Sequence, residues 1–150
     1  MRTDILAISS GGGHWVQLLR LKPAFDSHKV VFASVYEAYA ADVPGCKFYA
    51  FNDASRFSKA NYLVVIVQLL RIVLRERPRV VITTGSSPGL FALALAKILL
   101  RSKTIWIDSI ANCEQVSSSG ERARWIADVW LTQWEHLSNV EGPRYLGAVI

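Results

Sequence analysis

Residues 5–21 read ILAISSGGGHWVQLLRL, and this stretch decides the fold. The apolar run over residues 5–9 is typical of a buried strand, and a helix is predicted from His14 to Lys22. Gly11, Gly12 and Gly13 join the two elements, so no side chain shields the backbone N–H groups at the start of the helix. Such a turn lets a phosphate approach the helix N-terminus, although a tight structural turn is the alternative.

Two familiar phosphate-binding motifs do not fit this turn. The dinucleotide fingerprint would place another glycine three residues after Gly13, where the chain has Val16. A Walker loop needs Gly-Lys followed by Ser or Thr, and the sequence contains no such triplet. The sequence therefore predicts a phosphate-approach turn of another kind.

The alternation of strand and helix continues along the chain. Strands are predicted over residues 29–35, 47–51, 79–85, 103–109 and 129–133, with a last strand-like run over 145–150. Helices are predicted over residues 60–77 and 90–100, and a further helix precedes residue 129. Nearly continuous apolar strands between helices are typical of a parallel sheet covered on both faces. We therefore expect one α/β domain over residues 1–150, with a Rossmann-like parallel sheet and helices on both faces.

The composition favours an anionic partner. The chain has 150 residues, of which 51% are hydrophobic, and a formal net charge of +5. A basic protein suits nucleic acid, acidic lipid or a phosphorylated ligand. Basic and aromatic residues do not interleave as in RNA-recognition motifs, so nucleic acid is not expected. The three histidines lack metal-ligand spacing, so neither a metal nor a bound cofactor is expected. No signal peptide or membrane-spanning run is visible.

The predicted helix over residues 60–77 is apolar nearly all round. Its only polar stripe is narrow and consists of Gln68, Arg71 and Arg75. A surface helix normally has a wide polar face. Its second face is therefore either buried within the domain or in contact with a partner or a membrane surface. In the second case Arg71 and Arg75 are candidates to contact anionic headgroups; otherwise they are solvated cations at the helix C-terminus.

Polar residues follow three of the predicted strands. The first cluster is the glycine turn, the second contains Ser86 and Ser87 at a helix start, and the third is Asp108-Ser109. Asn112 and Glu114 follow the third strand closely. In an open parallel sheet, ligands bind beyond the carboxyl ends of the strands. The three clusters are therefore predicted to form one site, although the Ser86 turn alone also fits a capped helix start.

Four segments follow one another along the chain: SSGGGHWVQLLRL, ITTGSSPG, IDSIANCEQVSSSG, and ADVWLTQWEHL followed by GPRYLGAVI. In this order they resemble the asparagine-linked-glycosylation-fourteen family, and most closely its bacterial capsule and exopolysaccharide branch. The resemblance implies the N-terminal half of a split GT-B glycosyltransferase, whose separately encoded partner subunit binds the UDP-sugar. The layout is also similar to the acceptor domain of the peptidoglycan GlcNAc transferase.

The resemblance also implies a function. The pair is expected to add glucuronic acid, a hexose or GlcNAc, with inversion, to a polyprenyl-diphosphate-linked sugar at the cytoplasmic face of the inner membrane. Eukaryotic relatives begin with a membrane-spanning helix, and this chain shows none, so peripheral attachment is expected. Where the family more often has Glu-Ser, this chain has Asp108-Ser109.

The resemblance assigns expected roles to the candidate residues. Gly11, Gly12 and Gly13 are expected to approach a diphosphate, where the helix dipole stabilises the leaving UDP. His14 and Asp108 are the catalytic candidates, because the dipole favours a neutral imidazole and a carboxylate can act as a base or orient one. The remaining expectations are Ser86, Ser87, Asn112 and Glu114 for the acceptor, Arg71 and Arg75 for the membrane, and Gln133 and Trp134 for the partner subunit.

Two other functions stay open at this point. The chain is either catalytic or a scaffold that only recruits the donor-binding subunit to the membrane. A free-standing nucleotide-binding module is the other class, with Glu37, just past the second predicted strand, as a candidate ribose ligand. A structural role is the alternative for two candidates. His14 could cap the helix or pack against it, and Trp134 could simply pack in the domain.

Overall fold

The computed structural model describes residues 3–53 and 59–149 of the chain. Within them, seven parallel strands form one sheet in the order β3-β2-β1-β4-β5-β6-β7. The strands are β1 (Ile5–Ile8), β2 (Val30–Ser34), β3 (Lys47–Ala50), β4 (Val80–Thr83), β5 (Lys103–Ile107), β6 (Val129–Thr132) and β7 (Arg144–Tyr145). The predicted Rossmann-like α/β fold is confirmed.

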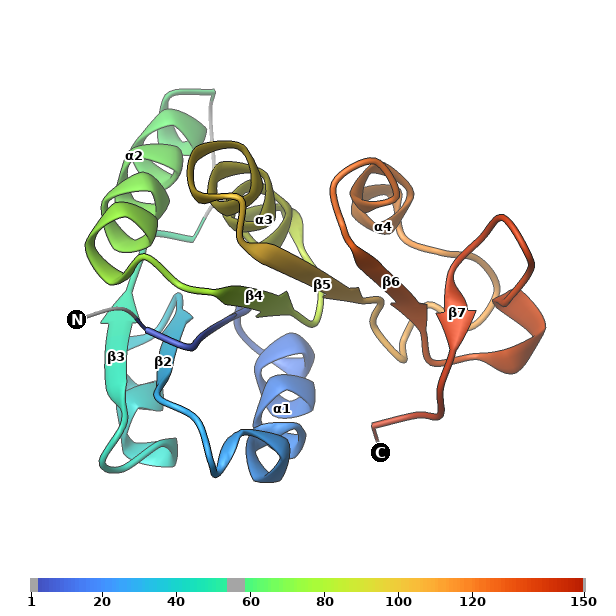
Figure 1. Cartoon of the computed structure of the whole chain (residues 1–150), viewed down its shortest axis with the longest axis horizontal. Helices are drawn as coiled ribbons and strands as arrows, with labels where there is room; N and C mark the ends of the chain where they lie inside the picture. Colours follow the sequence, from blue (N-terminus) through green and yellow to red (C-terminus); the bar gives the residue numbers. More distant parts are fainter. Residues whose placement is uncertain (1–2, 54–58, 150) are drawn as a thin grey trace.

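Helices cover both faces of the sheet (Figure 1). One side carries α1 (Gly13–Arg20) and the 3-10 helices η1 (Lys22–Phe25) and η2 (Glu37–Asp42). The other side carries α2 (Lys59–Glu76), α3 (Ser87–Leu100) and α4 (Ser118–Ala123), and the 3-10 helix η3 (Glu135–Leu137) follows β6. Neighbouring strand residues supply the two layers alternately: Ala7 packs with Trp15 of α1, whereas Leu6 and Ile8 belong to the core beneath α2 and α3.

The strand order changes direction at β1. The chain moves from β1 to β2 and β3 on one side, and then returns to place β4 and β5 on the other. Ile5 is therefore in register with both Val30 and Val80. The segments that follow β1 and β4 diverge above this point, which is where open α/β sheets bind ligands.

Two details of the sequence-based prediction are wrong. The last strand was expected over residues 145–150, but β7 contains only Arg144 and Tyr145, and Ile150 lies outside the described residues. Gly147 has a φ of +109°, which interrupts the extended backbone. The helix expected over residues 90–100 begins earlier, at Ser87, because Pro88 fits the first helical turn.

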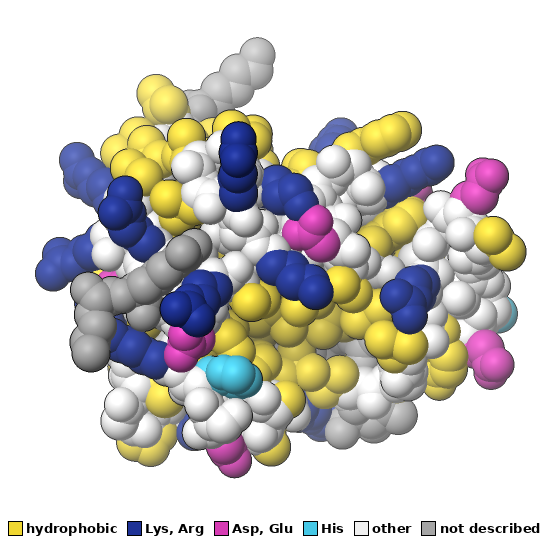
Figure 2. Space-filling view, viewed as in Figure 1, with side chains coloured by type: hydrophobic (Ala, Val, Ile, Leu, Met, Phe, Trp, Pro, Cys, Tyr) yellow, Lys and Arg dark blue, Asp and Glu magenta, His cyan; other side chains and the backbone are white. Residues whose placement is uncertain are grey.

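The second face of α2 is exposed, which decides between the two alternatives left open by the sequence. Val65, Leu69 and Val73 are buried in the core, whereas Leu63, Val67 and Leu74 on the other side are exposed. Figure 2 shows hydrophobic side chains over α2 with lysine and arginine side chains around them. Of the two alternatives, burial of this face within the domain is therefore excluded. No helix among the described residues is both long and apolar enough to cross a bilayer.

A buried carboxylate fixes the end of α2. Glu76 accepts hydrogen bonds from Lys47 Nζ at 2.5 Å, Tyr49 Oη at 2.6 Å and Thr3 Oγ1 at 2.8 Å. Burial alone raises the pKa of the Glu76 carboxyl, but these three donors outweigh it and lower the pKa to about 2. The C-terminal turn of α2 is thereby tied to β3 and to the start of β1.

Candidate functional site

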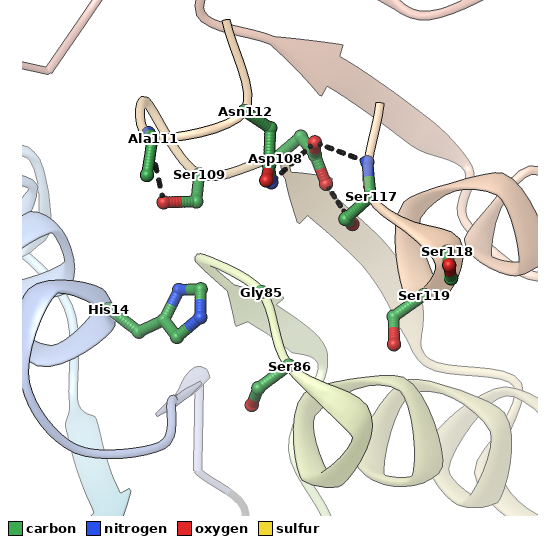
Figure 3. A pocket seen from close by; sticks show the side chains of 10 residues that line it. All are labelled: His14, Gly85, Ser86, Asp108, Ser109, Ala111, Asn112, Ser117, Ser118 and Ser119. Atoms are coloured by element: carbon green, nitrogen blue, oxygen red, sulfur yellow. Dashed lines mark hydrogen bonds between the residues drawn. The ribbon is translucent and has the colours of Figure 1, made fainter. Parts of the chain in front are cut away.

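The carboxyl ends of β1, β4 and β5 meet around two adjoining cavities. The first, the His14 cavity, has a volume of about 250 Å³ (Figure 3). Its lining residues are His14, Gly85, Ser86, Asp108, Ser109, Ala111, Asn112, Ser117, Ser118 and Ser119. The second, the glycine-turn cavity, has a volume of about 350 Å³ and is lined by Ser10, Gly11, Gly12, Tyr36, Asp53, Tyr62, Ser86, Ser87 and Pro88. The structure thus brings together most of the predicted site residues, and Ser86 borders both cavities.

His14 is held in one orientation by Thr84. Its Nδ1 lies 3.1 Å from the Thr84 carbonyl oxygen, and Thr84 Oγ1 donates to the His14 carbonyl oxygen at 2.7 Å. A carbonyl oxygen only accepts, so Nδ1 carries the proton in this contact. In the neutral ring Nε2 is then the unprotonated nitrogen. This tautomer, assigned from the hydrogen bond, is the one a general base at Nε2 requires.

Gly85 gives the imidazole its space. The backbone at Gly85 has a φ of +125°, which side-chain-bearing residues rarely adopt. A Cβ atom at this position would lie 2.9 Å from His14 Cε1. Glycine is therefore required at position 85 both by its own backbone and by the ring packed against it.

Asp108 is buried and organises the loop that faces His14. Its carboxylate accepts hydrogen bonds from Ser117 N at 3.0 Å, Ser117 Oγ at 2.6 Å, Asn112 Nδ2 at 3.0 Å and Trp106 Nε1 at 3.1 Å. Figure 3 shows the bonds to Ser117 spanning from the strand end to the start of α4. Four donors occupy both oxygens, so this geometry favours a positioning role for Asp108 over that of a free base.

The loop places polar groups on the wall opposite His14. Ser117, Ser118 and Ser119 line the cavity together with Asn112, whose Nδ2 is engaged by Asp108. Hydroxyl and amide groups of this kind suit the hydroxyls of a sugar. Glu114, also expected to bind the acceptor, is exposed and lines neither cavity, and the same holds for Glu37, the candidate ribose ligand.

The glycine turn is only partly free for a phosphate. Gly12 N donates to Tyr39 Oη at 3.1 Å, so this amide already has a partner within the chain. Gly13 is the first residue of α1 and is exposed, while Gly11 and Gly12 line the glycine-turn cavity. An anion at this turn would therefore meet the N-terminus of α1 beside a tyrosine hydroxyl, which the sequence did not predict.

Ser86 begins α3 with a strained backbone. Its φ is +75°, and it occupies the N-cap position of α3. Its side chain nevertheless makes no capping hydrogen bond, so the alternative of a side-chain-capped helix start does not hold for Ser86. Among the described residues its Oγ is buried without a hydrogen-bond partner. A strained residue with an unsatisfied hydroxyl between two cavities is typical of a ligand-binding position.

Gln133 was expected at the partner interface, but it is buried within the chain. Its side chain is buried and donates to Gln17 Oε1 at 2.6 Å and to the Asp108 carbonyl oxygen at 2.9 Å, while its Oε1 accepts from Val149 N at 2.8 Å. Gln17 Nε2 in turn donates to Ser109 Oγ at 3.1 Å. The two glutamines connect α1, the end of β5 and the C-terminal segment from inside.

Trp134 and the two arginines keep their candidate roles. Trp134 is half-buried, and its Nε1 donates to the Ile110 carbonyl oxygen at 2.8 Å. Arg71 and Arg75 are exposed and line a further cavity of about 190 Å³ with Tyr49 and Gln68. Neither arginine side chain takes part in the site described above.

Several positioning residues were not identified from the sequence. Thr84 lies in the predicted turn after β4, and Gln17 lies one turn after the glycines. The neighbouring sequence does not show that Thr84 contacts His14 or that Gln17 contacts Ser109. Tyr39 is 27 residues from the amide that it accepts from. The serine run 117–119 is visible in the sequence, and its position after Asp108 was the one signal that could have placed it in the site.

Comparison with known proteins places the chain in a family and confirms the fold. A family model described as "Oligosaccharide biosynthesis protein Alg14 like" matches residues 44–149, which begin after the glycine turn. No curated protein matches the chain. Among solved structures, MurG of Acinetobacter baumannii superposes with a TM-score of 0.72 at 11% identity, covering 94% of this chain and 44% of that chain.

Two UDP-N-acetylglucosamine 2-epimerases are also similar. That of Rickettsia bellii gives a TM-score of 0.67 at 15% identity, covering 91% of this chain and 40% of that one. That of Neisseria meningitidis, solved bound to UDP-GlcNAc, gives 0.61 at 10% identity, covering 89% and 41%. The chain spans about two fifths of the length of these proteins. At such identities the likeness is one of fold, and it agrees with the predicted GT-B half.

Proposed function

The chain belongs to the Alg14-like family of oligosaccharide biosynthesis proteins, and on that premise we propose that it is one half of a two-chain inverting glycosyltransferase. The family and the MurG-like fold support a glycosyltransferase-associated role in a lipid-linked sugar pathway. In the proposed reaction the partner subunit supplies a UDP-sugar carrying glucuronic acid, a hexose or GlcNAc. This chain binds a polyprenyl-diphosphate-linked sugar, in exopolysaccharide or capsule biosynthesis.

The observation that carries the proposal is the orientation of His14. With Nδ1 directed at the Thr84 carbonyl oxygen, Nε2 is the basic atom beside a cavity lined by hydroxyl groups. In the proposed step Nε2 takes the proton of the acceptor hydroxyl, and that oxygen forms a bond to the anomeric carbon of the donor sugar. The bond from the anomeric carbon to UDP breaks, and UDP leaves with the electron pair.

The surrounding groups position the acceptor. Asn112 and the serines 117–119 are proposed to bind the acceptor sugar, in a loop that Asp108 holds in place. The glycine-turn cavity, with Ser86 and Ser87 on one wall and Gly11 and Gly12 on the other, is proposed to take a diphosphate. The N-terminus of α1 then supplies electrostatic stabilisation to the charged groups of donor or acceptor.

The proposed attachment is at the cytoplasmic face of the inner membrane, and the outer face of α2 supports a membrane contact. Leu63, Val67 and Leu74 expose apolar surface, and Arg71 and Arg75 are exposed cations on the same helix. Apolar side chains that enter the headgroup region, flanked by arginines, are the elements of a peripheral membrane contact. Tyr62, in the first turns of this helix, also lines the glycine-turn cavity, so a lipid-linked substrate would enter from the membrane side.

The proposal is tested by reconstituting the pair. The chain is co-expressed with the neighbouring open reading frame of its source genome and assayed with UDP-sugars and a prenyl-diphosphate-sugar acceptor. We expect transfer only when both chains are present. His14→Ala should lower kcat by about 100-fold or more with the complex intact, because general bases contribute about 10²–10⁴. His28→Ala, an exposed histidine away from both cavities, is the matched control.

Two results would contradict the proposal in different ways. Transfer by this chain alone would show that it is no half-enzyme. Near-wild-type turnover by the His14→Ala pair would leave the chain as a non-catalytic scaffold that recruits the donor-binding subunit. Asp108 would not be the base in that case, because its carboxylate already accepts hydrogen bonds from four donors.

A further inference from the structure

Five exposed residues where α3 and α4 end form what we call the α3–α4 shoulder. They are Ile98, Leu99, Arg101, Arg124 and Trp125. Ile98 is 77% exposed and Trp125 is 79% exposed, whereas Trp15 and Trp106 are buried in the two cores. Tryptophan is rarely left so open in a soluble domain. Helices α3 and α4 contact each other, so an exposed tryptophan and two exposed aliphatic side chains at their ends mark an interaction surface.

The two ends of the shoulder are held together. Lys97 in the last turn of α3 forms an ion pair with Asp128, which follows the α4 segment. The pKa of Asp128 is lowered: burial opposes this, but hydrogen bonds from Lys97 and Thr104 outweigh it. Thr104 N also donates to Asp128 Oδ2 at 2.8 Å, so the segment that carries Trp125 is anchored to β5. The shoulder is thus part of the rigid domain.

The chemistry of the shoulder favours one kind of partner. The Arg124 guanidinium lies over the Trp125 ring, 4.9 Å from its centroid, and Arg101 at the end of α3 and Arg122 of α4 are also exposed. Glu121 is the acidic residue of α4, and the charge of Asp128 is engaged by Lys97. Tryptophan prefers the boundary between water and acyl chains, and arginine pairs with anionic headgroups. The excess of positive charge fits an anionic lipid surface.

We infer that the α3–α4 shoulder is a second membrane contact, separate from the outer face of α2, and that Trp125 inserts at the bilayer interface. The inference rests on the proposed membrane attachment and extends it. Helices α2, α3 and α4 cover the same side of the sheet, and Tyr62 of α2 contacts Phe91 of α3 with ring centroids 6.1 Å apart. Figure 2 shows hydrophobic side chains alternating with lysine and arginine along the upper edge, over all three helices.

Two contacts define an orientation that a single helix does not. The outer face of α2 alone would allow the domain to rock about the helix axis. With the shoulder also on the membrane, the sheet has a fixed orientation relative to the bilayer. The glycine-turn cavity, next to the first turns of α2, then stays at a constant distance from the lipid. The shoulder thereby positions the proposed diphosphate site without contacting the substrate.

The test uses the full chain and vesicles of phosphatidylcholine with or without phosphatidylglycerol, in a sedimentation assay. Trp125→Ala is expected to lower the partition coefficient on phosphatidylglycerol vesicles by about tenfold, through loss of an interfacial aromatic side chain. The matched control is Val140→Ala, which removes a fully exposed apolar side chain in the segment before β7. Circular dichroism confirms that both variants are folded.

A second readout detects contact directly. Brominated lipids quench tryptophan fluorescence only when the ring reaches the acyl region, so quenching is expected in the wild-type chain. Trp125→Phe should retain binding and lose most of this quenching, because Trp15 and Trp106 are buried and Trp130 and Trp134 are only partly exposed. Sugar transfer to a detergent-solubilised acceptor by the reconstituted pair should be unchanged in Trp125→Ala.

The outcomes separate this inference from the proposed function. If the wild-type chain binds vesicles and Trp125→Ala binds equally well, or if Trp125→Phe leaves the quenching unchanged, the shoulder is not a membrane contact while the α2 contact stands. Equal binding to neutral and anionic vesicles would overturn the role of the arginines. If the wild-type chain binds no vesicle, both membrane contacts fail, whereas the transferase proposal is judged by the detergent assay alone.

Discussion

Thr84 clamps His14 at two points, through its carbonyl oxygen to Nδ1 at 3.1 Å and through its hydroxyl to the His14 carbonyl oxygen at 2.7 Å. The two residues are 70 positions apart in the sequence; His14 lies at the start of α1 after β1, and Thr84 directly follows β4. The contact therefore joins the start of α1 to the turn before α3. The orientation of the proposed base is set by the strand order, because β1 and β4 are adjacent.

Gly85→Ala is expected to disable the clamp. The new Cβ atom would lie 2.9 Å from His14 Cε1, so the ring must move, and the φ of +125° adds backbone strain. We expect kcat of the reconstituted pair to fall by about 100-fold, comparable with the loss of a general base. Gly45→Ala is the matched control, because Gly45 has a φ of +80° with nothing near the added Cβ. Equal effects of the two variants on kcat would show that strain, not the displaced ring, is responsible.

Asp108→Asn is expected to loosen the loop opposite His14. The amide keeps the shape of the carboxylate, but its nitrogen does not accept, so at least one of the bonds from Ser117 or Asn112 is lost. Loss of a buried, charge-assisted hydrogen bond costs about 1.5–3 kcal/mol of stability. We expect a lower Tm and a KM for the acceptor that rises more than kcat falls. Glu114→Gln, on the same loop but outside the cavity, is the control and should change neither value.

If Asp108 acted as the base, the kinetic pattern would differ. kcat would collapse in Asp108→Asn while KM for the acceptor stayed near the wild-type value, since the proton acceptor would be gone with the site intact. Steady-state kinetics of the pair with varied acceptor concentration distinguishes the two patterns. We expect the larger change to be in KM for the acceptor, because the Asp108 carboxylate accepts four hydrogen bonds and so positions the loop.

The parts of the molecule that could be predicted are those fixed by local pattern. The apolar strands and the glycine turn predict the parallel sheet. The polar residues after β1, β4 and β5 predict the edge of the sheet at which the cavities lie. Gln133 shows the limit of such reasoning. A glutamine after a strand looks like a surface residue, yet its burial depends on Gln17, which is 116 positions away and satisfies it.

The exposed face of α2 shows a second limit. The sequence shows that the helix is apolar nearly all round, but which side packs on the sheet depends on the rotation of the helix in the fold. Likewise, the sequence shows that the glycine turn has backbone N–H groups without side chains around them. It does not show that Gly12 N donates to the hydroxyl of Tyr39, which η2 brings to the turn. Long-range packing decides both features.

Glu76→Gln is expected to remove stability at neutral pH. The folded pKa of about 2 lies below the ordinary value of 4.5, so the ionised carboxylate stabilises the fold at every pH above 4.5. A difference of this size corresponds to about 3 kcal/mol, which the wild-type chain loses as pH falls from about 4.5 towards 2. Urea unfolding from pH 7 to pH 3 should show the variant less stable at pH 7 and the two chains converging in acid. A constant difference across this range would show that Glu76 acts by packing alone.

Arg71→Glu with Arg75→Glu is expected to weaken binding to anionic vesicles. Each arginine near a negative surface contributes about 1 kcal/mol, so reversing both charges should lower the partition coefficient by at least about 30-fold at low salt. Both side chains are exposed and distant from the core, so the Tm should not change. Arg20→Glu with Lys29→Glu makes the same change of charge at exposed residues outside α2 and is the control. An equal loss of binding in both pairs would show that net charge, and not the face of α2, governs the attachment.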